Sequence, residues 1–288
     1  MKLGISGQAL GDVMSFGDIV KLGKKYGVTD YEIWPCNTGV ACDYAQGDLE
    51  GIQKVMRDED VRIFCVTQGA GFSPEAVADP AVYAEYLIHA VDAAAELGAQ
   101  VVNHYCGNIS SSDLPDFDVL EQYWRGPLEH AEKRGVPLVL ENEAHDSTST
   151  PRKMRRILEH FRHPRFRTNF DAVNYFHASC EGFPGAYEVL RPFIGYEHIT
   201  NACLYDPETD QPAYNRGMPM SGLYAPAPIQ YTTILEGAVN IPALLTRLEQ
   251  DGEYTGVCTL EPHTTPEHVE EFYARESAWL RSLGFFQE

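Results

Sequence analysis

Short apolar runs alternate with longer segments of helical periodicity along the whole chain. The runs are rich in β-branched residues and do not alternate between polar and apolar positions, which is typical of strands buried on both faces. They predict eight strands, at residues 3–6, 31–35, 61–67, 101–106, 137–143, 166–173, 194–200 and 256–262. The segments between them predict eight helices, near residues 17–26, 48–58, 80–97, 117–134, 151–162, 184–191 and 240–250, with the last ending near 282.

Residues that favour helix ends support several of these boundaries. Asp79 can cap the helix that begins with Pro80, and Thr150 precedes Pro151 in the same way. Proline is tolerated in the first helical turn, where its missing N–H has no intrahelical partner. Gly135 favours a helix end at the preceding residue.

A regular alternation of strand and helix predicts parallel strands. Eight repeats in 288 residues predict one domain, residues 1–288, folded as an α/β (β/α)8 TIM barrel. A doubly wound open sheet has the same alternation, so periodicity alone leaves it as an alternative.

One segment after the seventh strand, residues 201–238, breaks this rhythm. It contains five prolines and four tyrosines, and we expect a long irregular insertion there. Long loops in compact domains are often lids or binding surfaces. We therefore expect a lid or a partner-docking loop, with an ordinary insertion packed on the barrel exterior as the alternative.

Four potential metal ligands follow one another at the ends of the last four predicted barrel strands. They are Glu141, Asp171, His198 and Glu261. In a parallel barrel the carboxyl ends of the strands share one rim, so these side chains are expected to converge. Two Glu, one Asp and one His suit Mn²⁺, Mg²⁺, Co²⁺, Zn²⁺ or Fe²⁺ rather than a soft metal.

Composition and charge exclude several classes of function and indicate a compartment. The net charge is −20, which would repel a nucleic acid, and a 44% hydrophobic content is enough for a full core. The seven cysteines are scattered without a C-x-x-C pair, and an odd count with several thiols in strand-like runs favours a reducing compartment. No apolar run approaches the length of a membrane span or a signal peptide, so we expect a cytoplasmic protein without membrane contact.

The stretches LENE, NFDAVN, EHITN and TLEP, around the four ligand candidates, resemble the xylose isomerase-like TIM barrel superfamily. That superfamily includes sugar epimerases, inosose dehydratases and endonuclease IV. The resemblance implies that Glu141, Asp171, His198 and Glu261 hold one divalent metal, with Mn²⁺ expected first. It also implies that the metal holds two oxygens of a carbohydrate, while acid and base groups move a proton on a carbon next to a carbonyl.

The resemblance also directs the choice of reacting groups. Base candidates are Glu141 and Glu261, as in the ketose epimerases, or His145, whose ordinary pKa suits proton transfer near neutrality. A loop histidine in solvent is the alternative for His145. We expect substrate contacts at four further residues, with core packing as the alternative for the first two: His104, Trp34, Asn174 and Arg216.

The chain also departs from the pattern of the superfamily. Asn174 stands where epimerases and endonuclease IV often carry His, and the stretch NACLYD after His198 lacks the Arg that epimerases place there. The additional Asp-x-His pair of endonuclease IV is absent from the sequence. A three-metal nuclease is therefore not expected, and standard ketohexose epimerisation has less support.

Three functions remain open at this point. The first is a metal-dependent sugar isomerase or epimerase. The second is a lyase acting on an inosose or a 3-keto sugar, resembling inosose dehydratases or the α-subunits of C-glycoside deglycosidases. The third is a non-catalytic metal- or sugar-binding barrel. The expected substrate is a small carbohydrate or keto-glycoside, and we expect an oligomer, in the lyase case with a small partner subunit.

Overall fold

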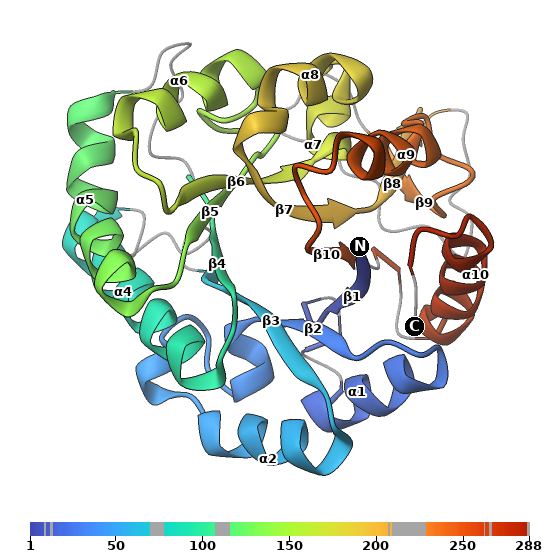
Figure 1. The fold of residues 1–288 in the computed structure, drawn as a ribbon, viewed down its shortest axis with the longest axis horizontal. Coiled ribbons are helices and arrows are strands. Elements are labelled where there is room, and N and C mark those ends of the chain that lie inside the picture. The colour runs from blue at the N-terminus through green and yellow to red at the C-terminus, as the bar shows by residue number, and fades with distance from the viewer. Residues whose placement is uncertain are drawn as a thin grey trace.

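The computed structural model describes residues 1–8, 10–11, 14–69, 78–106, 116–206, 208, 229–261, 263–264 and 267–286. Eight parallel strands close into a barrel in the order β1-β10-β7-β6-β5-β4-β3-β2, surrounded by helices (Figure 1). The strands are β1 (Lys2–Ser6), β2 (Asp30–Ile33), β3 (Arg62–Thr67), β4 (Val101–His104), β5 (Leu138–Glu141), β6 (Phe166–Asp171), β7 (Ile194–Ile199) and β10 (Val257–Leu260). The predicted TIM barrel is confirmed, and the open doubly wound sheet is excluded.

The helices of the described chain follow the strands in sequence and form the outer ring (Figure 1). They are α1 (Phe16–Lys25), α2 (Leu49–Glu59), α4 (Pro80–Leu97), α5 (Phe117–Arg134), α6 (Pro151–Phe161), α7 (Ala172–His177), α8 (Tyr187–Leu190), α9 (Ile241–Asp251) and α10 (Val269–Ser282). Within the described residues, none of these helices is long and apolar enough to cross a membrane.

The capping residues set these boundaries as expected. Asp79 accepts a hydrogen bond from the Ala81 N–H at the start of α4, and the side chain of Thr150 caps α6. Gly135 ends α5 with φ 78°, a left-handed conformation that glycine adopts without steric cost.

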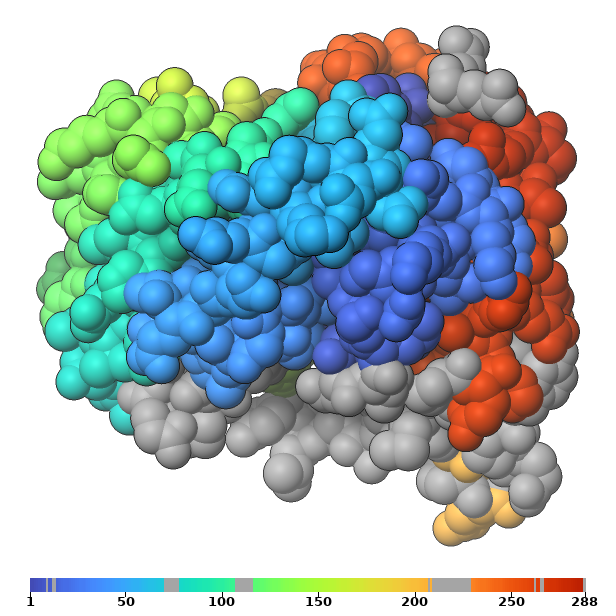
Figure 2. Space-filling model, turned by 90° about the horizontal axis from the view of Figure 1, so that it is seen from below, coloured from blue at the N-terminus to red at the C-terminus, as the bar shows by residue number. Residues whose placement is uncertain are grey.

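The first and last helices lie side by side and close the ring (Figures 1 and 2). Lys25 of α1 forms an ion pair with Glu270 of α10 at 2.8 Å. Arg281 of α10 donates a hydrogen bond to the carbonyl of Tyr26, which caps α1. The exposed ion pair contributes little, and buried apolar surface supplies most of the stability.

The register of the strands sets the ligand candidates at one rim. Asp171 on β6 is paired with His198 on β7, and Glu141 on β5 is paired with Asn169. Glu261 follows the last residue of β10, and its N–H donates to the Ile199 carbonyl at 3.1 Å. The carboxyl ends of β5, β6, β7 and β10 therefore meet at the same level of the barrel.

The insertion after β7 contains regular structure that the sequence did not predict. Strands β8 (Asn201–Leu204) and β9 (Ile229–Thr232) pair antiparallel as a separate two-stranded sheet. The Asn201 amide donates to the carbonyls of Ile234 and Val239 and thereby pins the start of the segment to its end. The long insertion after β7 is confirmed, its described ends form this small sheet, and residues 209–228 lie outside the described chain.

The region after β6 also differs from the prediction. The chain enters α7 directly after Asp171, because the Asp171 side chain caps the new helix. The helix expected over 184–191 is shorter: a wide turn at Gly182–Ala186 leads into α8 at Tyr187–Leu190.

Glu276 of α10 bonds the backbone of the insertion, and a substitution there tests what this contact contributes to stability. It is buried, and its Oε2 accepts a hydrogen bond from the Ile234 N–H at 3.1 Å. Burial raises the pKa of Glu276 to about 7. Since the folded-state pKa lies above the unfolded value, this group loses stabilising free energy as the pH rises from about 4.5 to about 7.

The variant Glu276→Gln is neutral at every pH and keeps an oxygen to accept from Ile234. We expect its free energy of unfolding, measured by urea denaturation, to exceed that of the wild type by about 1–3 kcal/mol at pH 8 and by little at pH 5. Exposed Glu249 on α9 offers the control Glu249→Gln, which should show no pH-dependent difference. An equal effect of Glu276→Gln at both pH values would contradict this assignment.

Candidate metal centre and its cavity

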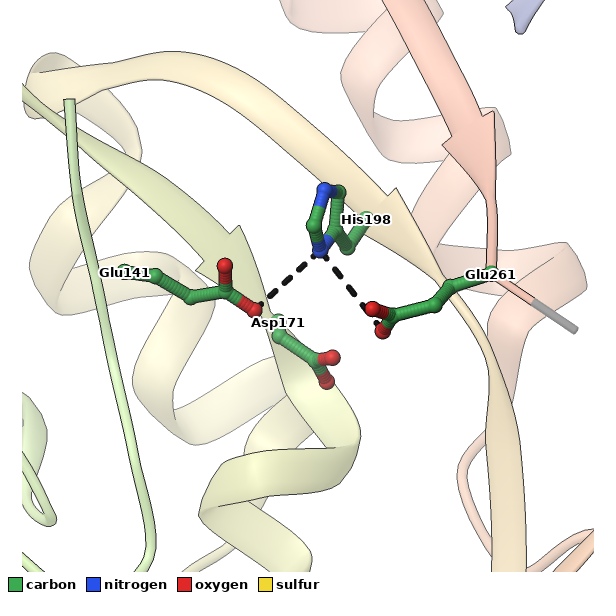
Figure 3. A group of neighbouring side chains, drawn as sticks. All are labelled: Glu141, Asp171, His198 and Glu261. Carbon is green, nitrogen blue, oxygen red and sulfur yellow. Dashed lines mark hydrogen bonds and ion pairs between the residues drawn. The ribbon is translucent and has the colours of Figure 1, made fainter. Parts of the chain in front are cut away.

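Four buried side chains from four neighbouring strand ends point toward one another at the carboxyl rim of the barrel (Figure 3). Glu141, Asp171, His198 and Glu261 each offer one ligand atom, and these atoms lie within 4.8 Å of one another. The structure therefore brings together the set that the sequence singled out.

The Glu141 carboxylate is oriented by two amides from neighbouring strands. Its Oε2 accepts hydrogen bonds from the side chains of Asn103, at 2.7 Å, and Asn169, at 2.9 Å. Its Oε1 lies 3.1 Å from His198 Nδ1. One oxygen is thus fixed by the barrel interior, and the other faces the cluster.

Asp171 combines a helix cap with a place in the cluster. Its Oδ1 accepts from the backbone N–H groups of Val173 and Asn174 at 2.6 and 3.0 Å. The Asn142 side chain bonds both the N–H and the carbonyl of Asp171. Both the side chain and the backbone of Asp171 are therefore held, and within the described residues no hydrogen bond engages Oδ2.

His198 lies between carboxylates on two sides. Its Nδ1 lies 3.7 Å from Glu261 Oε2 as well as close to Glu141, and its Nε2 lies 2.7 Å from Glu32 Oε2. Glu261 in turn accepts a hydrogen bond from His263 Nε2 at 3.1 Å. The imidazole thus directs one nitrogen at the cluster and the other into the barrel.

The electrostatics of this group favour a cation. Burial, together with the nearby Glu141 and Glu261, raises the pKa of Asp171 to about 7. Burial alone would lower the pKa of His198, but the surrounding carboxylates outweigh it and hold that pKa well above its usual value. A divalent ion among these carboxylates would relieve their mutual repulsion.

The donor set fits such an ion. Three carboxylates and one imidazole suit a hard or borderline divalent metal, and the described ion pairs of Glu141 and Glu261 involve histidines alone. The four residues could therefore hold one divalent metal ion, although the set does not select manganese over its neighbours.

A cavity of about 270 Å³ opens beside the cluster. It is lined by Gln8, Tyr105, Glu141, Glu143, His145, Asn174, His177, Tyr231, Glu261 and His263. Strong negative charge, three imidazoles and two phenol rings make it a polar pocket with aromatic walls.

His145 and Asn174 of the sequence prediction line this cavity. His145 Nδ1 lies 3.6 Å from Glu143 Oε2, and burial lowers the pKa of His145. It is therefore a neutral imidazole at pH 7 and not a loop histidine in open solvent. The Asn174 side chain donates to the Asn142 carbonyl at 2.9 Å, so part of its capacity is used within the protein.

Several lining residues were missed in the sequence. Glu143 and His263 each lie two residues beyond a ligand candidate, in LENE and LEPH, and that spacing was an available signal. His177 ends α7, a helix that was not predicted. Tyr231 lies on β9 and stacks on His263 with ring centroids 3.7 Å apart, so the described end of the insertion forms part of the wall.

His104 does not reach the cavity, and its expected substrate contact is wrong. Asn103 and His104 point to opposite faces of β4, and Asn103 faces the interior, where it bonds Glu141. His104 therefore faces outward and packs between the rings of Trp124 and Phe166.

Trp34 is also a packing residue rather than a sugar platform. It is 5% exposed, its ring packs near Tyr105, and its indole N–H donates to Glu32 Oε1 at 2.7 Å. The fourth expected substrate contact, Arg216, lies outside the described residues.

Comparison with known proteins agrees with this architecture. The profile of the xylose isomerase-like TIM barrel family matches residues 20–283. No curated protein matches the chain.

Three similar solved structures have related folds at low sequence identity. The 3-keto-D-glucoside 4-epimerase from E. coli is 18% identical, with a TM-score of 0.69 over 98% of this chain and 99% of that chain. The IOLI protein with a binding zinc atom is 12% identical, with a TM-score of 0.72 over 100% of both chains. Mannonate dehydratase from Streptococcus suis is 14% identical, with a TM-score of 0.68 over 98% of this chain and 92% of that chain. At these identities the likeness shows the fold alone.

The ligand assignment can be tested without disturbing the fold. Asparagine is as good a helix cap as aspartate, so Asp171→Asn should retain α7 while removing one negative charge from the cluster. We expect the wild type to bind one Mn²⁺ per chain by isothermal titration, and the affinity of the variant to fall at least about tenfold. The control Asp92→Asn removes an outer carboxylate that pairs with His130 and Arg134, and it should bind as the wild type does. Unchanged affinity in Asp171→Asn would remove Asp171 from the site.

Proposed function

The chain belongs to the xylose isomerase-like TIM barrel family, and on that premise we propose that it is a divalent-metal-dependent carbohydrate enzyme. The proposed reaction removes a proton from the carbon beside a ketone, as in a sugar isomerase or epimerase. The observation that carries this proposal is the buried Glu-Asp-His-Glu cluster opening onto a cavity that holds a neutral imidazole.

His145 is the first candidate for the base. It lines the cavity with Glu141 and Glu261, and burial keeps its pKa below the ordinary value of 6.5. It is therefore available to accept a proton at neutral pH, and a positioned base of this kind contributes about 10²- to 10⁴-fold to a rate.

Glu141 and Glu261 are the other base candidates. Both line the cavity, and they approach it from different strands, β5 and the end of β10. This placement suits removal of a proton by one carboxylate and its return by the other, which would invert a carbon centre. Glu261 has His263 within hydrogen-bond distance to accept the proton in turn.

Substrate hydroxyls have candidate partners on the same wall. His177 lines the cavity and is 4% exposed, and its Nε2 has no hydrogen-bond partner among the described residues. A buried polar atom of this kind normally finds a partner, and a sugar hydroxyl would provide one. Asn174 lies nearby on the same helix and remains our proposed second contact.

The metal would be held by Glu141, Asp171, His198 and Glu261, with manganese as our first choice. Its positive charge would stabilise the negative charge that develops on the ketone oxygen. The protein's own part is to hold the donors in place, exclude bulk water from a buried cluster and move the proton.

A lyase is the second candidate, and the presence of both His145 and His177 in one cavity favours it. After the proton leaves, the electron pair forms a carbon–carbon double bond and expels a group from the next carbon. The imidazole that accepts the first proton becomes an imidazolium and can then protonate the leaving group, which departs as water from an inosose or as an aglycone from a 3-keto sugar, while the other imidazole can hold the substrate.

For the lyase candidate we propose an oligomer that contains a small partner subunit. We also propose that the insertion, residues 201–238, acts as a lid or as the surface on which a partner docks. The support is the position of Tyr231 in the cavity wall and the 63% exposure of Leu204 on β8. A non-catalytic metal- or sugar-binding barrel is the third candidate.

Deuterium exchange distinguishes these reactions. The Mn²⁺-loaded protein would be incubated in D₂O with free ketoses, inososes and 3-keto glycosides and followed by mass spectrometry and NMR. Deuterium on the carbon beside an intact ketone is the result that the proposal predicts. Loss of water or of an aglycone would establish the lyase instead, and no change in any substrate would favour the non-catalytic barrel.

The role of His145 has its own prediction. His145→Ala should slow deuterium exchange at least about 100-fold while Mn²⁺ affinity is unchanged, because a base is removed and no ligand is touched. In the wild type, the exchange rate should fall as the pH drops through a value below 6.5, where His145 is protonated. His130→Ala, on α5 where the imidazole pairs with Asp92 of α4, is the control. Full exchange in His145→Ala would assign the base role to Glu141 or Glu261.

A further inference from the structure

Glu32 lies in the middle of the barrel, is fully buried and does not belong to the four-residue cluster. Its Oε1 accepts hydrogen bonds from the Trp34 indole at 2.7 Å and from the Thr67 hydroxyl at 2.9 Å. Its Oε2 accepts from the Tyr196 hydroxyl at 2.7 Å and lies 2.7 Å from His198 Nε2. Side chains from β2, β3 and β7, or directly beyond them, thus fix both oxygens.

The imidazole of His198 lies between this carboxylate and the cluster. Its Nε2 faces Glu32, while its Nδ1 faces Glu141 and Glu261. A ring flip would place a ring carbon where each nitrogen now lies and would break the contacts with both Glu32 and Glu141. Because Glu32 can only accept there, it requires the proton of the ring on Nε2 and leaves the lone pair of Nδ1 for a ligand.

We infer that Glu32 is a positioning residue for the metal centre: it sets the ring orientation and the tautomer of His198, so that Nδ1 presents its lone pair to a divalent cation. The inference rests on the proposed metal-dependent function. Carboxylates that bond the far nitrogen of a ligand histidine raise its basicity, and their loss typically weakens metal binding 10- to 100-fold.

The surroundings of Glu32 distinguish this role from a simple buried ion pair. Burial of a charged pair is expensive and is often no better than apolar packing. Here Trp34, Thr67 and Tyr196 all direct hydrogen-bond donors at one carboxylate, and two of these donors secure the oxygen that does not contact His198. The carboxylate is held as a fixed acceptor, which is what orientation of the imidazole requires.

The test compares Glu32→Gln with the matched variant Thr67→Val. In Glu32→Gln, the amide N–H₂ has two possible orientations. If it faces the Trp34 indole N–H, two donors meet, which is unfavourable. If it faces His198 Nε2, that nitrogen has to accept, and the ring proton moves to Nδ1. Thr67→Val disturbs the same buried network but leaves the contact with His198 in place. For each protein we would measure the Kd for Mn²⁺ by electron paramagnetic resonance of the free ion, and Tm without metal.

We expect the Kd to rise about 10- to 100-fold in Glu32→Gln and to stay within about threefold of the wild type in Thr67→Val, even where the Tm of both variants falls. In ¹⁵N-histidine NMR of the Zn²⁺-loaded wild type, His198 should show a protonated Nε2 and a coordinated Nδ1.

Equal Kd values for Glu32→Gln and the wild type would overturn the inference and leave the proposed metal site standing, and so would a coordinated Nε2. Equal weakening in both variants would also overturn it, because a general loss of packing would then be the cause. A wild type that does not bind Mn²⁺ or Zn²⁺ at the cluster would reject the proposed function and the role of Glu32 together.

Discussion

The repulsion among buried carboxylates at one rim of the barrel is the constraint on which the rest of the site depends. Glu141, Asp171 and Glu261 converge there. The His198 imidazole lies between this group and the buried carboxylate of Glu32. Charges in a protein interior require a partner, and His198, with His263 beside Glu261, is a poor match for four carboxylates. A cation would offset this repulsion, so the cluster could hold a divalent metal ion.

The barrel supplies the precision that such a site needs. Three of the four ligand candidates are held by other parts of the barrel: two amides bond Glu141, Asn142 and the α7 backbone bond Asp171, and Glu32 contacts His198. The barrel core therefore fixes the donors before any ligand arrives. Segments outside the barrel strands, including β9 of the small sheet after β7, line the neighbouring cavity.

Much of this could be predicted from the sequence, because the strongest signals are local. Apolar runs, the caps at Asp79 and Thr150, and acidic residues at strand ends each depend on a few neighbouring positions. The phase of β4 could not be predicted, since Asn103 and His104 are both polar and only the folded barrel shows which one faces inward. The role of Glu32 could not be predicted either, because Thr67, Tyr196 and His198 come to it from distant strands.

Diffraction from crystals grown with Mn²⁺, measured at the manganese absorption edge, would test the central claim most directly. The account predicts one strong anomalous peak among Glu141 Oε1, the Asp171 carboxylate, His198 Nδ1 and the Glu261 carboxylate, at bonding distance from all four. Absence of a peak there, with His198 Nδ1 still hydrogen-bonded to Glu141, would show that the cluster is a buried ion-pair network and would contradict the account.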